Sequence, residues 1–278
     1  MAKTIIECAL TGAITPKAKA PAIPTTPKEI AEDAVRVWKA GASIVHIHTR
    51  DENQRGCMDP KQFKEICERI RDNTDLILNL TTAGGPTPTQ EARWEHVLEN
   101  LPEMCSYDCG SFNWLPMPKA YLNEVTFLQG LGKVCIENKI RPEIEIFDVG
   151  QINAAKWFYD TGYLEKPMYF DFVLGVLGAS QATPKMVEFM KEMLPEGSNW
   201  TALGIGKDHL SILYTAIVHG GHVRVGLEDN IYYSRGVVAT NEQLVARAAR
   251  VIKEFNNEVA TPDDARQILK VGKYYDAE

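Results

Sequence analysis

The sequence predicts an α/β protein, and within that class a single (β/α)8 barrel of the TIM type with one extra helix at its C-terminal end. Short apolar segments alternate with helical segments along the chain, and eight such pairs within about 260 residues match the size of this barrel. A doubly wound open sheet is the alternative, because the number of strands alone does not prove that the sheet closes. No linker, long repeat or low-complexity segment divides the chain, so we expect one domain over residues 1–278, with 261–278 as a C-terminal extension.

The expected strands are short apolar runs that end in polar residues. They cover residues 5–12, 44–50, 76–83, 105–111, 142–148, 168–175, 200–206 and 222–229. The expected helices lie near residues 27–40, 60–73, 88–100, 118–138, 150–162, 184–194, 207–219 and 240–256, with one more from 261. Thr-Pro pairs mark several helix starts: Thr26-Pro27-Lys28-Glu29 forms a capping box, Thr87-Pro88-Thr89-Gln90 repeats the device, and Thr183 and Thr261 each precede a proline.

The composition is that of an ordinary globular protein, with 45% hydrophobic and 24% charged residues. The net charge of −7 and the lack of any basic tract exclude nucleic acid as an expected partner. Glu7 interrupts the apolar run that a signal peptide needs, and no apolar stretch approaches about 18 residues, so we expect a cytoplasmic protein without a membrane segment. The six cysteines form no Cys-x-x-Cys pair and are expected to be reduced thiols.

Two histidines at the end of the strand over 44–50 are the first candidates for a functional site. Side chains alternate along a strand, so His46 and His48 point to the same face about 7 Å apart and can converge on one ion if a third ligand is supplied. For this pair alone, two structural core histidines are about equally plausible. A second polar cluster at residues 222–230 favours the metal, because it provides a carboxylate, Glu228, in the last expected strand.

Two acids in the strand over 142–148 also require partners. Glu143 and Glu145 share one face, and strands covered by helices are normally apolar on both faces, so inward acids need a counter-charge. Arg224 shares a face with Glu228 and provides that charge. A buried structural salt bridge is the alternative, but acids, an arginine and histidines that point into one barrel mouth favour a functional cluster.

His46, His48 and Glu228 with an open fourth position form a two-histidine, one-carboxylate set. This set suits a catalytic zinc ion, although non-haem Fe(II) uses the same ligand types. Because fewer than four protein ligands leave a vacant position, we expect Lewis-acid chemistry on a carbonyl oxygen rather than a structural metal. Asp229 is then placed to serve as a base, with Arg224 holding it ionised.

Two glycine segments give weaker signals. Gly84-Gly85 and residues 204–207 each precede an expected helix, where free backbone N–H groups can bind a carboxylate or phosphate, although such glycines are more often plain turns. The remaining histidines that we considered, His96, His209 and His219, are expected to be structural.

Several of these motifs together resemble the β-keto acid cleavage enzymes. They are His46-Ile-His48 preceded by Ala-Gly-Ala-Ser-Ile-Val, Thr82-Ala-Gly84-Gly85, Phe172-Val-Leu-Gly-Val, and Gly220-Gly-His-Val-Arg224-Val-Gly-Leu-Glu228-Asp229-Asn230. The resemblance covers nearly the whole chain and implies a zinc-dependent (β/α)8 barrel, usually a homotetramer, with one zinc ion per subunit. It also implies the family reaction, in which a β-keto acid and acetyl-CoA give acetoacetate and a new acyl-CoA by carbanion attack on the thioester, CoA transfer and retro-Claisen cleavage.

The resemblance also assigns roles to individual residues. His46, His48 and Glu228 match the zinc ligands. Arg224 and Asp229 match the charged pair that removes a proton from the keto acid, and Glu143 matches an acid near the reacting centre. The positions that contact the substrate are Thr82, Gly84, Gly85, Ser106 and Ile14.

Ile14 is the departure from the family pattern that matters most. The family member of lysine fermentation has a glutamate at this position, which receives the ammonium group of its substrate. An isoleucine would leave a buried ammonium unpaired, so we predict a keto acid with an uncharged or differently charged tail.

Two alternative functions use the same residues. A class II type aldolase or a metal-dependent hydrolase would use the metal with an aldol acceptor or water, and would not depend on acetyl-CoA. A non-catalytic metabolite-binding barrel would keep the metal-ligating residues, and replacement of Asp229 by asparagine would then change no detectable activity. The stability cost of keeping a buried polar cluster argues against this alternative.

Overall fold

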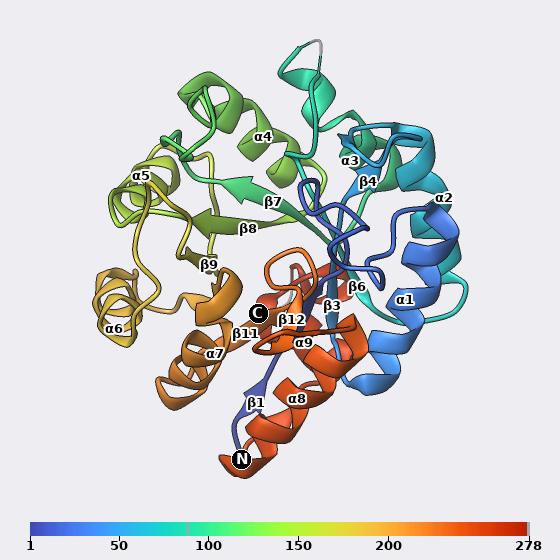
Figure 1. Cartoon of the computed structure of the whole chain (residues 1–278). Helices are drawn as coiled ribbons and strands as arrows, with labels where there is room; N and C mark the ends of the chain where they lie inside the picture. Colours follow the sequence, from blue (N-terminus) through green and yellow to red (C-terminus); the bar gives the residue numbers. More distant parts are fainter. Residues whose placement is uncertain (88, 277–278) are drawn as a thin grey trace.

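The computed structural model describes residues 1–87 and 89–276, in which eight parallel strands close into a barrel surrounded by helices (Figure 1). Around the barrel the strands follow the order β10-β11-β2-β3-β6-β7-β8-β9. Their bounds are β2 Ile6–Ala9, β3 Ile44–Ile47, β6 Ile77–Leu80, β7 Met104–Asp108, β8 Arg141–Ile146, β9 Tyr169–Leu174, β10 Asn199–Gly204 and β11 His222–Val225. The predicted (β/α)8 barrel is confirmed. The open sheet is excluded because the first barrel strand, β2, pairs with the last one, β11, as well as with β3, which closes the ring.

The helices alternate with the barrel strands, as the sequence predicted. Their bounds are α1 Pro27–Ala40, α2 Pro60–Arg71, α3 Glu95–Asn100, α4 Val125–Glu137, α5 Gly150–Asp160, α6 Pro184–Met193, α7 His209–Val218, α8 Asn241–Glu254 and α9 Pro262–Leu269. Short 3-10 turns cover η1 Glu91–Arg93, η2 Gly206–Asp208 and η3 Gly272–Tyr274.

Two helix predictions were wrong at their N-terminal ends. The helix expected near 88–100 is instead η1 followed by the short α3, and the capping motif proposed at Thr87–Gln90 includes Pro88, which lies outside the described residues. The helix expected near 118–138 begins at Val125, because the preceding loop folds back on itself through paired backbone hydrogen bonds between Phe112 and Tyr121. That loop is important below, because it covers one side of the site.

The local capping signals are confirmed at the helices where they were clearest. The Thr26 hydroxyl accepts a hydrogen bond from the N–H of Glu29, whose side chain binds back to the Thr26 N–H, which completes a capping box on α1. Thr183 and Thr261 cap α6 and α9 in the same manner through their hydroxyl groups. These caps explain why the sequence alone located the starts of these helices.

The interior of the barrel is polar, whereas its outer face is apolar. Val45 and Ile47 on β3 pack outward in the main hydrophobic core, in the same cluster as Phe63 of α2, whereas His46 between them points inward. At the opposite end of the barrel, Leu269 of the C-terminal α9 belongs to a second core cluster at the strand starts. Packing therefore closes one end of the barrel and leaves the polar C-terminal ends of the strands for the site.

Three short two-stranded sheets complete the fold. They are β1 (Lys3–Thr4) with β14 (Glu258–Val259), β4 (Thr49–Arg50) with β5 (Gly56–Cys57), and β12 (Tyr232–Ser234) with β13 (Val237–Val238). All six cysteines are free thiols, as expected. Within the described part of the chain, no helix is both long and apolar enough to cross a bilayer.

Candidate metal centre and active site

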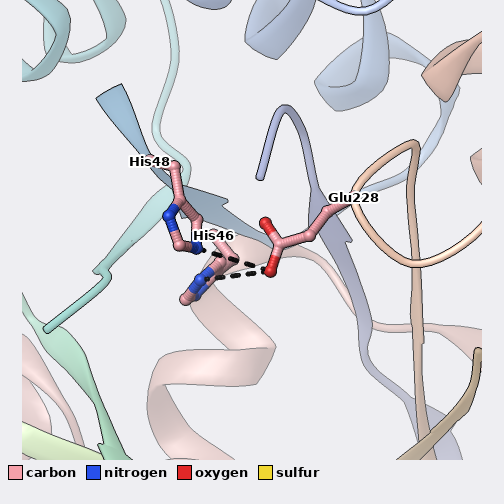
Figure 2. A group of neighbouring side chains, drawn as sticks. All are labelled: His46, His48 and Glu228. Carbon is pink, nitrogen blue, oxygen red and sulfur yellow. Dashed lines mark ion pairs between the residues drawn. The ribbon is translucent and has the colours of Figure 1, made fainter. Parts of the chain in front are cut away.

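Two imidazoles and one carboxylate, those of His46, His48 and Glu228, converge at the C-terminal end of the barrel (Figure 2). We call these three side chains the metal cluster, because they are the candidate ligands of a metal ion. His46 lies on β3 and His48 directly follows it, whereas Glu228 lies in the turn after β11. The Nε2 atoms of His46 and His48 are 3.7 and 3.5 Å from Oε1 of Glu228. The two imidazole rings lie on the same side of the chain, as the alternation of side chains predicted, and their centroids are 5.0 Å apart, closer than the expected spacing of about 7 Å.

Glu228 reaches this position by a route that the sequence did not predict. The strand expected over 222–229 ends at Val225, so strand alternation does not place Glu228. The chain turns at Gly226, whose φ is 149° and where a Cβ atom would lie 2.0 Å from the carbonyl oxygen of Ala9. The same carbonyl accepts a hydrogen bond from the N–H of Glu228 at 3.3 Å. Only glycine permits this close approach, which brings Glu228 back towards β2.

The three side chains fit a zinc ion by their chemistry and by their spacing. Two donors at about 2.1 Å from a tetrahedral zinc lie about 3.4 Å apart, close to the observed separations between Glu228 and the two histidines. The second carboxylate oxygen of Glu228 is buried and has no hydrogen-bond partner among the described residues. Burial lowers the pKa of His46 well below its usual value, which favours the neutral imidazole that binds metals.

Arg224 of β11 is the centre of the charged network beside this cluster. Its Nη2 atom is 2.8 Å from Glu228 and its Nε atom is 3.2 Å from Asp229. Its Nη1 atom lies 3.2 to 3.5 Å from three more carboxylates, those of Glu145, Asp171 and Glu143. These carboxylates outweigh the effect of burial and raise the pKa of Arg224, so the guanidinium stays charged.

Asp229 has the properties of a general base. Burial raises its pKa to about 6, against the lowering effect of the Arg224 guanidinium. A carboxylate with this pKa is mostly ionised at neutral pH and is more basic than an ordinary aspartate, which suits proton removal from carbon. Arg224 contacts Asp229 and favours its ionised form, as expected, but burial has the larger effect on its pKa.

A second network lies beneath the metal cluster and holds Glu143. The Asn79 amide donates hydrogen bonds to Oε1 of Glu7 at 2.8 Å and to Oε2 of Glu143 at 2.5 Å. The same Glu143 oxygen lies 3.9 Å from Nδ1 of His46, and this ring nitrogen has no hydrogen-bond partner among the described residues. Glu143 is completely buried, and burial raises its pKa. Its position fits the support of His46 better than direct contact with a substrate.

The predicted substrate-contacting residues lie in two different environments. Gly84, Gly85, Ser106 and Ile14 line the cavity above the metal cluster, and Ile14 is 62% exposed at its edge. Thr82 is completely buried, donates a hydrogen bond through its hydroxyl to the carbonyl of Ser106 at 3.1 Å, and therefore supports Ser106.

The two glycine segments do not provide free backbone N–H groups at helix starts. Gly85 is followed by η1 only at Glu91, and a Cβ at Gly85 would lie 2.4 Å from the carbonyl oxygen of Gly56, so this glycine permits close packing against β5. The N–H of Gly206 donates to the carbonyl of Asp229 at 2.9 Å. Both segments therefore form turns that shape the site, which is the more common of the two interpretations given for such glycines.

The histidines expected to be structural have structural contacts. His96 lies 2.8 Å from the carbonyl of Thr81 and stacks on Phe63. His209 lies 2.8 Å from the carbonyl of Gly206, and His219 ends α7.

A cavity of about 710 Å³ opens above the metal cluster. One side is formed by the metal cluster and the Gly84-Gly85 turn, and the other by the loop after β7, with Trp114 and Tyr121. This volume is sufficient for a small acid together with part of a larger co-substrate.

Sequence reasoning missed several polar side chains inside the barrel. Glu7, Asn79, Asp108 and Asp171 are all buried there, each within an expected strand. The available signal was one polar residue in the middle of an otherwise apolar run, the same signal that identified Glu143.

Comparison with known proteins places these features in a family context. The family model described as beta-keto acid cleavage enzyme matches residues 3–271. A 3-keto-5-aminohexanoate cleavage enzyme of Fusobacterium nucleatum is 42% identical over 98% of this chain and 100% of its own length. A 3-dehydrocarnitine:acetyl-CoA trimethylamine transferase of Rhizobium meliloti is 35% identical over 98% of this chain and 97% of its own length.

Solved structures support the fold at lower identity. The apo structure of ObcA matches with a TM-score of 0.78 at 20% identity and covers 91% of this chain and 66% of that chain. A truncated 3-deoxy-D-arabino-heptulosonate 7-phosphate synthase of Thermotoga maritima matches with a TM-score of 0.57 at 10% identity and covers 93% of this chain and 90% of that chain. At such identities the likeness extends to the barrel fold alone.

Proposed function

The chain belongs to the β-keto acid cleavage enzyme family, and on that premise we propose that it cleaves a β-keto acid with acetyl-CoA at a zinc ion held by His46, His48 and Glu228. The acetyl group of acetyl-CoA joins the CH2–COO⁻ part of the keto acid and gives acetoacetate. The remaining acyl group leaves on CoA as a new acyl-CoA. The observation that carries this proposal is the convergence of two imidazoles and one carboxylate beside the Arg224–Asp229 pair.

Each group of the site has a distinct task in this reaction. Zinc, when bound, would supply positive charge to the keto oxygen and so make the neighbouring CH2 group more acidic. Asp229 takes the proton from that carbon, and Arg224 orients Asp229 through Nε at 3.2 Å. Ser106, Gly84 and Gly85 line the same cavity and bind the substrate carboxylate in this proposal.

Glu143 acts in this proposal through His46 and not on the substrate. When Nε2 of a histidine binds a metal, its Nδ1–H usually donates to a carboxylate or carbonyl, which fixes the ring. Glu143 is the acid nearest to Nδ1 of His46, at 3.9 Å, and Asn79 holds it there. We therefore assign Glu143 as a positioning residue.

An assay with zinc-loaded protein, acetyl-CoA and a panel of β-keto acids tests the proposed function. Acetoacetate should form only when acetyl-CoA and a suitable keto acid are both present. Product formation that does not depend on acetyl-CoA would refute the proposal and support an aldolase or hydrolase. Complete inactivity of zinc-loaded protein that nevertheless binds keto acids would support a metabolite-binding barrel.

We further propose a homotetramer and a cytoplasmic location. The first rests on the family resemblance, and the second on the six free thiols, which are typical of a reducing compartment. Light scattering of the purified protein and fractionation of the producing cells test these two proposals separately.

A further inference from the structure

The wall of the cavity formed by the loop after β7 carries two aromatic side chains, Trp114 and Tyr121, together with Lys119. Paired backbone hydrogen bonds between Phe112 and Tyr121, at 3.1 and 2.8 Å, fold this loop into a compact cap. The ring centroids of Trp114 and Tyr121 lie 5.6 Å apart, and both are within 6.3 Å of the Phe147 ring at the end of β8. Trp114, Tyr121 and Phe147 all face the cavity.

One carboxylate, that of Asp108, is set in this aromatic wall. Asp108 is the last residue of β7, lines the cavity and is only 3% exposed. One of its oxygens accepts a hydrogen bond from the Tyr121 hydroxyl. Among residues 1–87 and 89–276, its other oxygen has no hydrogen-bond partner and forms no ion pair with a lysine, arginine or histidine, and it is not one of the fully buried oxygens.

The other acids of the site differ from Asp108 in this respect. Glu145, its neighbour on β8, pairs with Nη1 of Arg224 at 3.2 Å, and Arg224 also pairs with Glu228 and Asp229. Asp108 therefore presents a free acceptor oxygen to the cavity without an ion-pair partner among the described residues, although Arg93 and Lys119 also line this cavity. A carboxylate in such a place attracts a hydrogen-bond donor and repels an anion.

We propose that Asp108 selects the tail of the substrate: it accepts a hydrogen bond from a donor group on the tail and excludes tails that end in a carboxylate. This inference rests on the proposed function, because it takes the keto acid to be the occupant of the cavity. A hydroxyl and an ammonium are the two donors that share this chemistry. The absence of an acid at Ile14 favours the hydroxyl, and the experiment includes both.

Four six-carbon substrates separate these possibilities: 3-oxohexanoate, its 5-hydroxy and 5-amino derivatives, and 3-oxohexanedioate. For the wild type, kcat/KM for the better donor substrate should exceed that for 3-oxohexanoate by about 10- to 100-fold, the range of one hydrogen bond to a charged group. The dicarboxylate should be the poorest substrate. Preference for the dicarboxylate, or for plain 3-oxohexanoate over both donors, would overturn the proposal.

Two variants of Asp108 separate its charge from its capacity to accept a hydrogen bond. Asp108→Asn keeps an acceptor of the same size, so it should raise kcat/KM for the dicarboxylate about tenfold or more while part of the hydroxyl preference remains. Asp108→Leu removes the acceptor, so the donor preference should disappear. Since ratios between substrates are compared within one protein, reduced folding of a variant does not change them, and unchanged ratios in both variants would refute the role of Asp108.

A binding measurement separates this inference from the proposed function. Calorimetry gives the dissociation constants of the four keto acids for zinc-loaded protein without acetyl-CoA. The predicted order of affinities without acetoacetate formation would refute the cleavage reaction but support the tail subsite. Acetoacetate formation without any preference among the tails would support the cleavage reaction and refute the tail subsite.

Discussion

Replacement of Asn79 by leucine tests whether the buried network beneath the metal cluster holds His46 in place. Leucine has the same number of side-chain heavy atoms and the same branching but cannot donate the two hydrogen bonds, at 2.8 and 2.5 Å, to Glu7 and Glu143. Two buried acceptors would lose their donor at a cost of about 1–3 kcal/mol each, so the free energy of unfolding should fall by about 2–6 kcal/mol. Glu143 would then no longer be fixed near Nδ1 of His46, and zinc affinity should fall by about 10- to 100-fold.

Competition with a chromophoric chelator measures the zinc affinity, and thermal or denaturant unfolding of the same samples measures stability. Asn100→Leu is the matched control, because Asn100 is also buried and donates to a carbonyl, that of His96, away from the metal cluster. The control should lose stability but bind zinc as the wild type does. If Asn79→Leu loses stability and still binds zinc with unchanged affinity, the network is structural and the positioning role of Glu143 is refuted.

Three further predictions follow from the site and from one helix cap. Asp229→Asn should lower kcat/KM by about 100- to 10,000-fold with zinc affinity nearly unchanged, whereas the control Asp160→Asn on the exposed surface of α5 should leave kcat/KM unchanged. Equal kcat/KM values for the two variants would refute Asp229 as the general base. Gly226→Ala should cost at least about 2 kcal/mol of stability and weaken zinc binding, because φ is 149° there; wild-type affinity would contradict our account of the turn. Lys17 and backbone N–H groups outweigh burial and lower the pKa of Glu29 from 4.5 to about 2. Glu29→Gln should therefore be less stable than the wild type above pH 4.5, and this difference in the free energy of unfolding should shrink between pH 4.5 and 2. A difference that grows over this range in acid unfolding would contradict the prediction.

Interactions that are local in the chain could be predicted from the sequence. Alternation in the extended segment that contains β3 placed His46 and His48 on one side, and the Thr-Pro capping motifs located the starts of α1, α6 and α9. Each of these features depends on residues within a few positions of one another, so backbone geometry alone carries the information. Each strand and helix segment is likewise a local pattern, and the number and alternation of these segments identified the barrel.

Features that depend on distant segments were decided by the tertiary structure. Glu228 reaches the histidines because Gly226 turns the chain against Ala9, some two hundred residues earlier in the sequence, and this contact exists only when β11 pairs with β2. The loop before α4 looked helical, yet its pairing across Phe112 and Tyr121 decides its form.

The sequence by itself determined the eight strand–helix units, the family resemblance and the residue types of the candidate metal site. Only the tertiary structure decided which carboxylates have a partner: Glu143 is held by Asn79 and paired with Arg224, whereas Asp108 faces the cavity with one oxygen that has no partner among the described residues. The physical reason is that a carboxylate's partner is set by the register of neighbouring strands around the closed barrel. That register joins residues far apart in the chain, which no local pattern specifies.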